Sequence, residues 1–363
     1  MANALKDIYN EEFISKIATA ISEVYPIFDN DSFYEKVFSG NWEDKTLKER
    51  MRQITICLGA TLPDNYKEAI TILSTTVDKF PKNSLGCIFF PDFVEVYGLE
   101  DWETSIKALE LFTQHSTSEF AVRPFIVQDS ERMMKQMVAW SKHSNEHVRR
   151  IASEGSRPRL PWGMALKHFK EDPTAILPIL ENLKADESLY VRKSVANNLN
   201  DISKDHPKLV LDIAKKWYGE NTYTNWIIKH ACRTLLKKGN VEALAIFGFD
   251  VTQSTVQIND FKIYPENLSL GEDLHFSFNL TSEQSLMTKV RIEYAIDFVK
   301  AKGNRTKKIF KITENTIEKG KILSYDKIYS FKDLSTRKHY SGLHTITILI
   351  NGTEVISKDF SIE

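Results

Sequence analysis

The hydrophobic pattern of the chain changes its period near residue 250. Up to that point apolar residues recur at i, i+3, i+4 and i+7, as in 12–24, with short breaks that contain Pro, Gly, Asp or Asn. From Thr252 onward the pattern alternates with period two, as in 344–350. A chain of 363 residues also exceeds what one hydrophobic core usually supports. We therefore predict two domains, a helical one over 1–250 and a β-sandwich of roughly seven strands over 251–363.

An internal repeat runs through the helical half. Three segments superpose when they are aligned at Val148, Val191 and Ile228, with the sequences Val-Arg-Arg-Ile, Val-Arg-Lys-Ser and Ile-Lys-His-Ala. Their spacing of roughly 40 residues is the period of HEAT-type helical pairs. One such pair cannot bury its apolar positions alone, so successive pairs stack. The expected fold is mainly α: a HEAT-like α-helical solenoid, or α-α superhelix, with a C-terminal immunoglobulin-like β-sandwich.

The same superposition aligns cations in two adjacent columns of the inner helices. The first column holds Arg149, Arg192 and Lys229, and the second holds Arg150, Lys193 and His230. A row of cations on a concave surface suits the phosphate backbone of duplex DNA, where each neutralised phosphate adds affinity. The alternative is that each arginine pairs with an acidic residue of the neighbouring repeat. Both interpretations stay open for any single residue.

Composition and short motifs exclude several classes of protein. The net charge of −1 confines any DNA-binding surface to a local patch. The sequence contains no glycine-rich phosphate loop, no HExxH and no GxSxG, and its three cysteines form no CxxC pair. Its histidines lack the spacing of metal ligands. We therefore expect no metal site and no cofactor.

The sequence also carries no membrane or secretory signal. It has no run of about 18 apolar residues that could span a bilayer. Residues 1–13 lack the basic and apolar regions of a signal peptide. We expect a cytoplasmic protein that has no membrane partner and acts as a monomer.

Two passages concentrate polar and aromatic residues where the backbone should be irregular. They are 117–126 and 151–162. In the second, a helix that contains Glu154 near its end runs into a Pro-punctuated loop with Arg157, Arg159 and Trp162. Ordering such side chains costs conformational entropy, and a connection that only joins two helices offers no interactions that compensate for this cost. We therefore interpret this loop as functional.

Both passages resemble one family of DNA repair enzymes. The segments Ser118-Glu-Phe-Ala-Val-Arg-Pro-Phe125 and Ser153-Glu-Gly-Ser-Arg-Pro-Arg-Leu-Pro-Trp162 look like those of the HEAT-like DNA alkylation repair glycosylases, and most of all the AlkC branch. The resemblance covers residues 1–250. The C-terminal domain is similar to the immunoglobulin-like domain that some AlkC members carry.

The resemblance implies a monofunctional DNA glycosylase of base excision repair. Such an enzyme hydrolyses the N-glycosidic bond of cationic alkylated bases in duplex DNA, chiefly 3-methyladenine, with 3-methylcytosine as a second candidate. It acts without flipping the base, unlike most enzymes that do chemistry on bases. A cationic base is already a good leaving group, so the protein has only to stabilise an oxocarbenium-like sugar.

The resemblance also assigns roles to individual residues. Glu119 and Glu154 are expected to stabilise the positive sugar or to hold the attacking water. Trp162 is expected to pack on the sugar or backbone of the lesion. Cationic side chains of the helical half are expected to bind the DNA phosphates. These residues are Arg123, Arg149, Arg150, Arg157, Arg159, Arg192, Lys193 and Lys229.

The two carboxylates have structural alternatives. Glu119 could pair with Arg123, four residues later on one helix, a spacing that stabilises helices by about 0.2–0.5 kcal/mol. Glu154 could pair with Arg157 or Arg150 as a link between repeats.

Two further residues of the passages are ambiguous. Trp162 could belong to the core, because tryptophans are usually largely buried. Asp129 could be a site carboxylate, but its position favours a residue that starts a helix.

A basic turn is predicted in the β half. Lys302, Arg305 and Lys307 surround Gly303-Asn304, a sequence typical of a hairpin turn, and we expect these three cations to contact DNA. The alternative is a solvated turn that protects an edge strand. The same cluster includes Lys300 and Lys308, and a second, less specific cluster is Arg337-Lys338-His339.

Two other functions fit a helical solenoid. One is a protein-binding scaffold, and the other is a non-catalytic protein that recognises distorted or branched DNA. Neither function needs Glu119 and Glu154, so this pair of carboxylates favours the glycosylase. Its expected partner is duplex DNA that carries alkylated bases.

Overall fold

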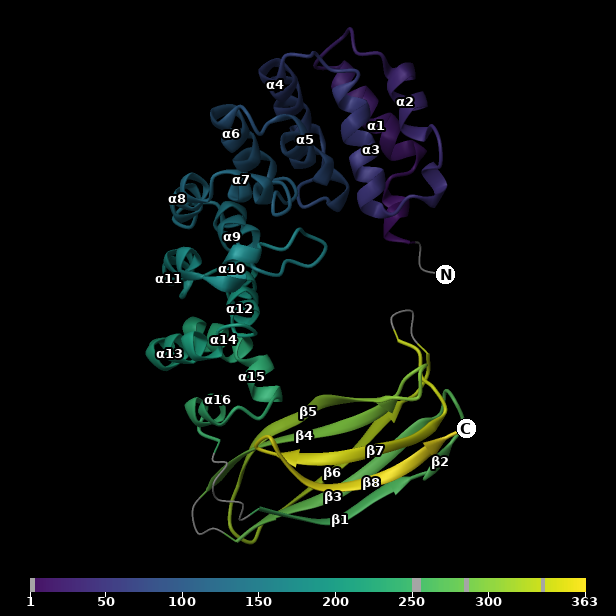
Figure 1. The fold of residues 1–363 in the computed structure, drawn as a ribbon, viewed down its shortest axis with the longest axis vertical. Helices are drawn as coiled ribbons and strands as arrows, with labels where there is room; N and C mark the ends of the chain where they lie inside the picture. Colours follow the sequence, from purple (N-terminus) through teal and green to yellow (C-terminus); the bar gives the residue numbers. More distant parts are fainter. Residues whose placement is uncertain (1–3, 250–255, 284–286, 334–336) are drawn as a thin grey trace. The chain divides into compact units, whose positions relative to one another are not determined.

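The computed structural model describes residues 4–249, 256–283, 287–333 and 337–363. These residues divide into two compact units, drawn in Figure 1. The first unit comprises Met1–Asp205 and Gly219–Ala231, and the second comprises His206–Tyr218 and Cys232–Glu363. The domain boundary predicted between residues 250 and 251 lies outside the described residues and stays a prediction.

The first unit consists of helices. Its α-helices are α1 (Glu11–Ser22), α2 (Asn30–Phe38), α3 (Leu47–Gly59), α4 (Tyr66–Thr76), α5 (Phe89–Tyr97), α6 (Trp102–Phe112), α7 (Val122–Gln128), α8 (Ser130–Trp140), α9 (Glu146–Gly155), α10 (Lys167–Glu171), α11 (Leu177–Leu183), α12 (Leu189–Ile202) and α14 (Thr222–Ala231). Its short 3-10 helices are η1 (Leu5–Ile8), η2 (Trp42–Asp44), η3 (Val77–Lys79), η4 (Leu85–Ile88) and η5 (Thr174–Ile176).

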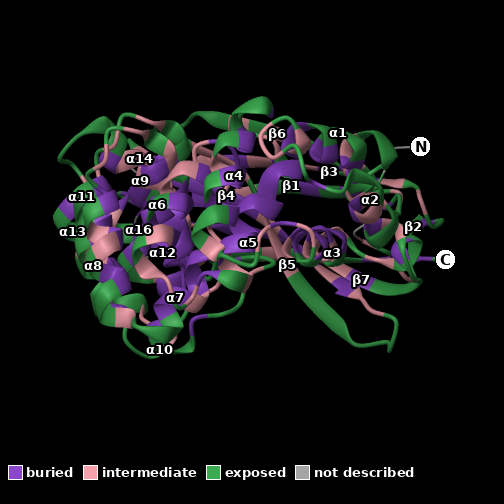
Figure 2. Ribbon diagram, turned by 90° about the horizontal axis from the view of Figure 1, so that it is seen from above, coloured by how far each residue is buried: buried purple, intermediate pink, exposed green. Residues whose placement is uncertain are grey.

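These helices stack in two rows, as a solenoid of helical pairs requires. Figure 1 shows α4, α6, α8 and α11 in one row and α5, α7, α9 and α12 in the other. In the second row α3 packs against α5, and α12 packs against both α9 and α14. Figure 2 shows buried residues concentrated on central helices such as α5 and α12, which gain their stability from burial between neighbours.

The three superposed sequence segments occupy equivalent places in α9, α12 and α14. Val148, Val191 and Ile228 are each completely buried, which is the role that the repeat assigns to them. Polar residues start the helices as expected. Asn145 caps α9 by accepting a hydrogen bond from the backbone N–H of His147, and Asp129 caps α8 in the same way. Asp129 is therefore a helix-start residue, as we interpreted it.

In its described residues, the second unit combines three helices with eight strands. The helices are α13 (Pro207–Trp217), α15 (Arg233–Lys237) and α16 (Val241–Ile246). The strands are β1 (Val256–Tyr264), β2 (Asn267–Leu268), β3 (Asp273–Ser282), β4 (Thr288–Val299), β5 (Arg305–Ile317), β6 (Ile322–Ser330), β7 (Gly342–Ile350) and β8 (Thr353–Ile362). The two-residue β2 pairs with β8 in parallel and is too short to show an alternating pattern in the sequence.

The strands form two sheets around one apolar core. The sheet orders are β1-β3-β6 and β2-β8-β7-β4-β5, and every pair except β2–β8 is antiparallel. The core includes Phe276, Phe278, Ile292, Ile348 and Phe360. This arrangement is the predicted sandwich.

The helices of the second unit are packed closely onto its strands. A Cβ atom at Gly352, in the turn between β7 and β8, would lie only 2.6 Å from Gly239 Cα, so the two backbones touch. Lys289 of β4 also donates a hydrogen bond of 2.6 Å to the carbonyl of Phe247. Residues on both sides of the predicted boundary thus share one compact unit.

In the described part of the chain, no helix has the length and apolarity to cross a bilayer.

Candidate active site

Glu119 lies in a turn between α6 and α7 and faces α9. Its Oε2 accepts a hydrogen bond of 2.8 Å from Thr117 Oγ1 and lies 2.7 Å from Arg150 Nη1. The alternative ion pair with Arg123 is not formed, because the Arg123 guanidinium bonds to backbone carbonyls instead. The turn therefore directs the carboxylate toward the next inner helix.

Glu119 is one end of a continuous row of opposite charges. Arg150 Nη2 lies 3.8 Å from Glu154 Oε1, and Arg157 Nη1 lies 2.6 Å from the same oxygen. Arg157 Nη2 in turn lies 2.8 Å from Oδ2 of Asp201, which belongs to α12. We call this set the carboxylate–arginine row: Glu119, Arg150, Glu154, Arg157 and Asp201.

The row holds one more carboxylate than it has arginines. Burial works to lower the pKa of Arg150 and of Arg157, but the adjoining carboxylates outweigh it and raise both pKa values. Three carboxylates alternate with these two arginines, and Lys204 adds one cation 2.9 Å from Asp201 at the far end. Such a surface can stabilise positive charge that develops on a neighbouring group.

Asp201 was missed by the sequence analysis. It lies near the end of α12 and is 3% exposed, together with the buried Asn198 and Asn200. The available signal was this run of polar residues on the face of α12 that also carries Val191, Val195 and Leu199, because buried polar groups need a partner or a function. Recognising Arg157 as the partner required the structure.

Trp162 is at the tip of the loop that follows α9. It is 63% exposed and has a φ of 62°, in the left-handed region. The alternative that Trp162 belongs to the core is therefore wrong. Such a backbone conformation costs roughly 1–3 kcal/mol in a residue other than glycine and occurs preferentially at functional sites. The base of the loop is anchored by Leu160 and Leu166, which are buried.

Arg123 holds this loop from beneath. The side chain is completely buried, Nε donates to the Met164 carbonyl at 2.6 Å, and Nη1 donates to the Gly155 carbonyl at 2.8 Å. Burial, followed by the charge of Arg157, lowers its pKa to about 10. The prediction that Arg123 binds DNA is wrong, since a side chain without exposed surface cannot reach a phosphate.

Arg157 also differs from its predicted role. It is 7% exposed, and its guanidinium is occupied by Glu154 and Asp201, so it orients carboxylates instead of binding a phosphate. Arg159 is more accessible, although it pairs with Asp205 at 2.6 Å. The pairing of Glu154 with both arginines, given above as a structural alternative, is present and forms part of the site.

Arg149 and Arg192 have equivalent structural roles. Arg149 donates to the carbonyls of His143 and Ser144, and Arg192 donates to the equivalent carbonyls of residues 186 and 187. Arg149 also pairs with Asp186 of the next repeat at 2.6 Å. Arg192 stacks on Tyr223 at the corresponding place. Arg149 thus pairs with an acidic residue of the neighbouring repeat, as the structural alternative predicted, whereas Arg192 contacts an aromatic ring of the next repeat instead.

The remaining predicted cations are on the surface. Lys193 and Lys229 are exposed on α12 and α14. In the second unit Lys302 is exposed in the turn between β4 and β5, where Gly303 has a φ of 78°. On β5, Arg305 lies 4.0 Å from Asp297, and Lys307 lies 2.6 Å from Glu354.

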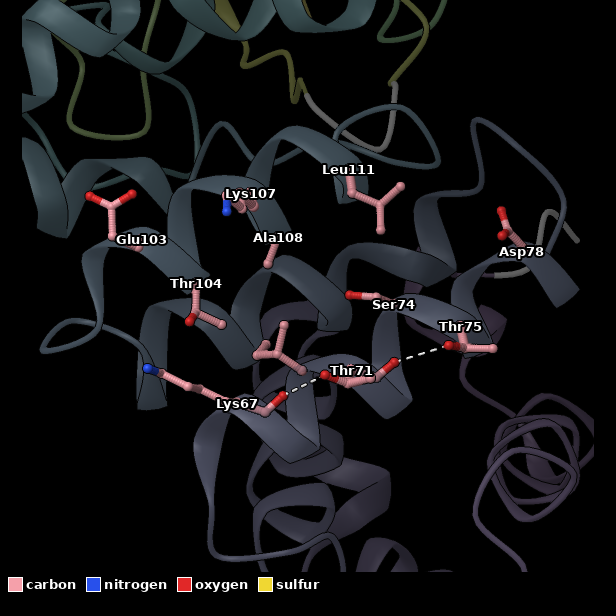
Figure 3. Close-up of a pocket in the computed structure, with 11 residues that line it drawn as sticks. Lys67, Thr71, Ser74, Thr75, Asp78, Glu103, Thr104, Lys107, Ala108 and Leu111 are labelled. Carbon is pink, nitrogen blue, oxygen red and sulfur yellow. Dashed lines mark hydrogen bonds between the residues drawn. The ribbon is translucent and has the colours of Figure 1, made fainter.

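Neither a groove elsewhere on the helices nor the metal-ligating residue types of the described residues add to this site. A groove of about 700 Å³ lies between α4 and α6 (Figure 3), and no predicted site residue lines it. Its Thr71 and Thr75 hydroxyls donate to helix carbonyls one turn earlier. Within the described ranges there is also no group of three His, Cys, Asp or Glu residues suited to a metal ion.

Comparison with known proteins agrees with this geometry. A family model described as DNA alkylation repair enzyme matches residues 103–235, the segment that contains the carboxylate–arginine row. The solved structure of Pseudomonas fluorescens alkylpurine DNA glycosylase AlkC, bound to DNA containing an abasic site analog, is 39% identical. It superposes with a TM-score of 0.96 over 99% of this chain and 100% of that one. The chain belongs to the AlkC branch of the DNA alkylation repair glycosylases.

The AlkC-like assignment extends to both ends of the chain. The C-terminal Ig-like domain of the uncharacterised protein YhaZ has its own family model, which matches residues 257–363. YhaZ of Bacillus subtilis (strain 168) is 56% identical over 99% of both chains. The resemblance and the fold class predicted from the sequence are thus confirmed.

Proposed function

We propose that this AlkC-like protein excises cationic N-alkylated bases from duplex DNA, chiefly 3-methyladenine, with 3-methylcytosine as a second substrate. One observation carries the proposal: Glu119 and Glu154 share a single guanidinium, Arg150, while the adjoining loop exposes Trp162. A protein-binding scaffold has no use for three coupled, partly buried carboxylates. In keeping with the proposal, the similar Pseudomonas protein is an alkylpurine DNA glycosylase.

The chemistry follows from the charge of the substrate. The bond between C1′ and the base nitrogen breaks, and its electron pair leaves with the base, which becomes neutral. Positive charge moves onto the sugar, where the carboxylate–arginine row stabilises it. Water then adds to C1′ and gives its proton to a carboxylate. The cationic base needs no protonation and no enclosed pocket, so the reaction proceeds without base flipping.

Glu119 is the best candidate to position this water. Its bonds within the described residues engage Oε2, which leaves Oε1 for water. Glu154 is more enclosed, because its Oε1 faces two arginines. We assign Glu154 and Asp201 to electrostatic stabilisation, and Trp162 to packing against the sugar or backbone of the lesion.

The DNA contacts are assigned to accessible cations. Lys193, Lys229 and Arg159 remain candidates on the first unit, and the exposed Lys302 is a candidate on the second. We propose that the protein acts as a monomer and as a monofunctional enzyme, which leaves an abasic site and does not cut the strand.

The test is the release of free base from duplex DNA that contains one 3-methyladenine. The proposal expects 3-methyladenine in the supernatant, an abasic site in the DNA and an intact strand until alkali is added. Tight binding of distorted or branched DNA without any base release would instead support the non-catalytic alternative.

A further inference from the structure

Lys48 connects the N-terminal helices to the loop that carries Trp162. It lies in the first turn of α3, where it is half-buried. Its Nζ donates a hydrogen bond of 3.0 Å to the backbone carbonyl of Trp162. The same Nζ lies 4.6 Å from the ring centroid of Phe120, the residue after Glu119. One ammonium group therefore contacts the tip of the loop and the turn that carries a site carboxylate.

Trp162 needs such a contact more than an ordinary loop residue does. Its φ of 62° is unfavourable for a residue with a side chain, and its indole is mostly exposed. Arg123 fixes the loop only at Gly155 and Met164, on either side of the tip. A charged donor strengthens a hydrogen bond to a carbonyl, so Lys48 is suited to hold the strained backbone in place.

Lys48 is itself held in a defined position. Thr46 and Glu49 form a capping box at the start of α3, with Thr46 N–H donating to Glu49 Oε2 at 2.8 Å. On its other side are Asp92 and Glu95 of α5, which are bridged by Arg52 at 2.8 Å each. Burial raises the pKa of both carboxyls, and the charge of Lys48 acts in the opposite direction on each.

The indole and the lysine also face a common cavity. A pocket of about 370 Å³ is lined by Leu5, Thr46, Leu47, Lys48 and Trp162. The indole thus borders open space into which it can rotate. Little packing in the described residues opposes such a rotation. A hydrogen bond of 3.2 Å from the Gly163 N–H to the Leu160 carbonyl closes the tip of the loop, and the hydrogen bond from Lys48 is the contact that ties the Trp162 carbonyl to α3.

We infer that Lys48 is a positioning residue of the active site: it fixes Trp162 and, through Phe120, the turn that presents Glu119. The inference rests on the proposed function for its effect on base release. The inference assigns α3 a role in positioning the active site, although α3 lies outside the segment 103–235 that the family model matches.

The first test does not depend on activity. The full chain is labelled with 5-fluorotryptophan, and the Trp162 fluorine resonance is assigned with Trp162→Phe. In Lys48→Met the Trp162 resonance should shift or broaden while the other tryptophan resonances stay in place. Methionine keeps the length and helix propensity of lysine, and unchanged resonances elsewhere show that the chain is folded. Lys107→Met, at an exposed position of α6, is the matched control and should leave Trp162 unchanged.

The second test separates positioning from DNA binding. Single-turnover release of 3-methyladenine at saturating DNA should fall roughly 10- to 100-fold in Lys48→Met, since displacement by about 1 Å has effects of this size. The dissociation constant for DNA with an abasic site analog should change less than threefold. Lys48→Arg should restore most of the rate, because a guanidinium can still donate to the Trp162 carbonyl.

Two results would overturn the inference. One is a Trp162 resonance that is the same in Lys48→Met and in the wild type. The other is weaker DNA binding with an unchanged saturated rate, which would make Lys48 a phosphate contact. A wild type that releases no base refutes the proposed function instead, and the fluorine spectra then still decide whether Lys48 holds Trp162.

Discussion

Arg150 Nη1 lies 2.7 Å from Glu119 Oε2, although the two residues come from different helical repeats. The same guanidinium reaches Glu154 and stacks on Tyr190 at 4.6 Å. An arginine held by two carboxylates and an aromatic ring has little freedom to move. The relationship therefore defines where the two carboxylates lie.

Asp201 and Asp205 form a matched pair for testing the buried end of the row. Both pair with an arginine, but the side chains of Asp201 and Arg157 are 4% and 8% exposed, whereas those of Asp205 and Arg159 are 27% and 30% exposed. Asp201→Asn should lower the free energy of unfolding by up to about 3–5 kcal/mol, because it removes one of the two carboxylates that compensate the buried Arg157 guanidinium. Asp205→Asn should cost about 0–1 kcal/mol. Equal losses in urea titrations would contradict this.

Arg123 should affect the loop and not the affinity for DNA. Arg123→Met removes two hydrogen bonds that anchor residues 155 and 164, so the midpoint of thermal unfolding and the rate of base release should both fall. The dependence of DNA affinity on salt should stay the same, since a buried cation releases no counterions. A smaller slope of log affinity against log salt would return Arg123 to the DNA-binding residues.

Lys193, in contrast to Arg123, should affect the affinity for DNA and not the rate of base release. It is exposed on α12, so Lys193→Gln should weaken binding to all duplexes alike and lower the salt slope by about one. Base release at saturating DNA should not change. Lys107→Gln on α6 makes the same change of charge outside the predicted site and serves as the control. Equal slopes for Lys193→Gln and the wild type would exclude this phosphate contact.

The sandwich should lose stability in mild acid. Burial is the main cause that lowers the pKa of His339 and of His344, and both imidazoles lie among aromatic rings of the core. The unfolded chain therefore binds these protons more readily than the folded chain, so stability falls as pH drops through about 6.5. Urea unfolding at pH 7.5 and 5.5 measures this. In His344→Phe the decrease should be smaller, and a more stable wild type at pH 5.5 would contradict the assignment.

The repeat and the two motifs were sufficient to predict the fold, and they supplied the residues of the proposed site. Periodicity identified the inner helices, and the motif residues Glu119, Glu154 and Trp162 do lie along one continuous stretch of contacts. The predictions were less successful for arginines. In a sequence, an arginine that holds buried carbonyls, such as Arg123, looks the same as one that faces a phosphate.

Contacts between distant segments could not be predicted. Lys48 meets the Trp162 carbonyl 114 residues further along the chain, and Arg157 meets Asp201 44 residues away. Lys48 and Trp162 do not follow the repeat spacing, because the loop after α9 departs from the regular helical pair. Arg157 and Asp201 are about one repeat apart, but the repeat pattern does not show which side chains meet. Periodicity also gives no information about irregular backbone, and Glu119 and Trp162 both lie in such segments.

The most direct test is single-turnover release of 3-methyladenine by the wild type, by Glu119→Gln and by the control Glu103→Gln, whose carboxylate is exposed on α6. Glutamine keeps the shape of the side chain and removes its charge and its capacity as a base. We predict that Glu119→Gln slows release at least 100-fold, that Glu103→Gln matches the wild type, and that all three bind DNA with an abasic site analog alike. Release by Glu119→Gln at the wild-type rate would contradict the assignment of Glu119, and absence of release by the wild type would contradict the glycosylase itself.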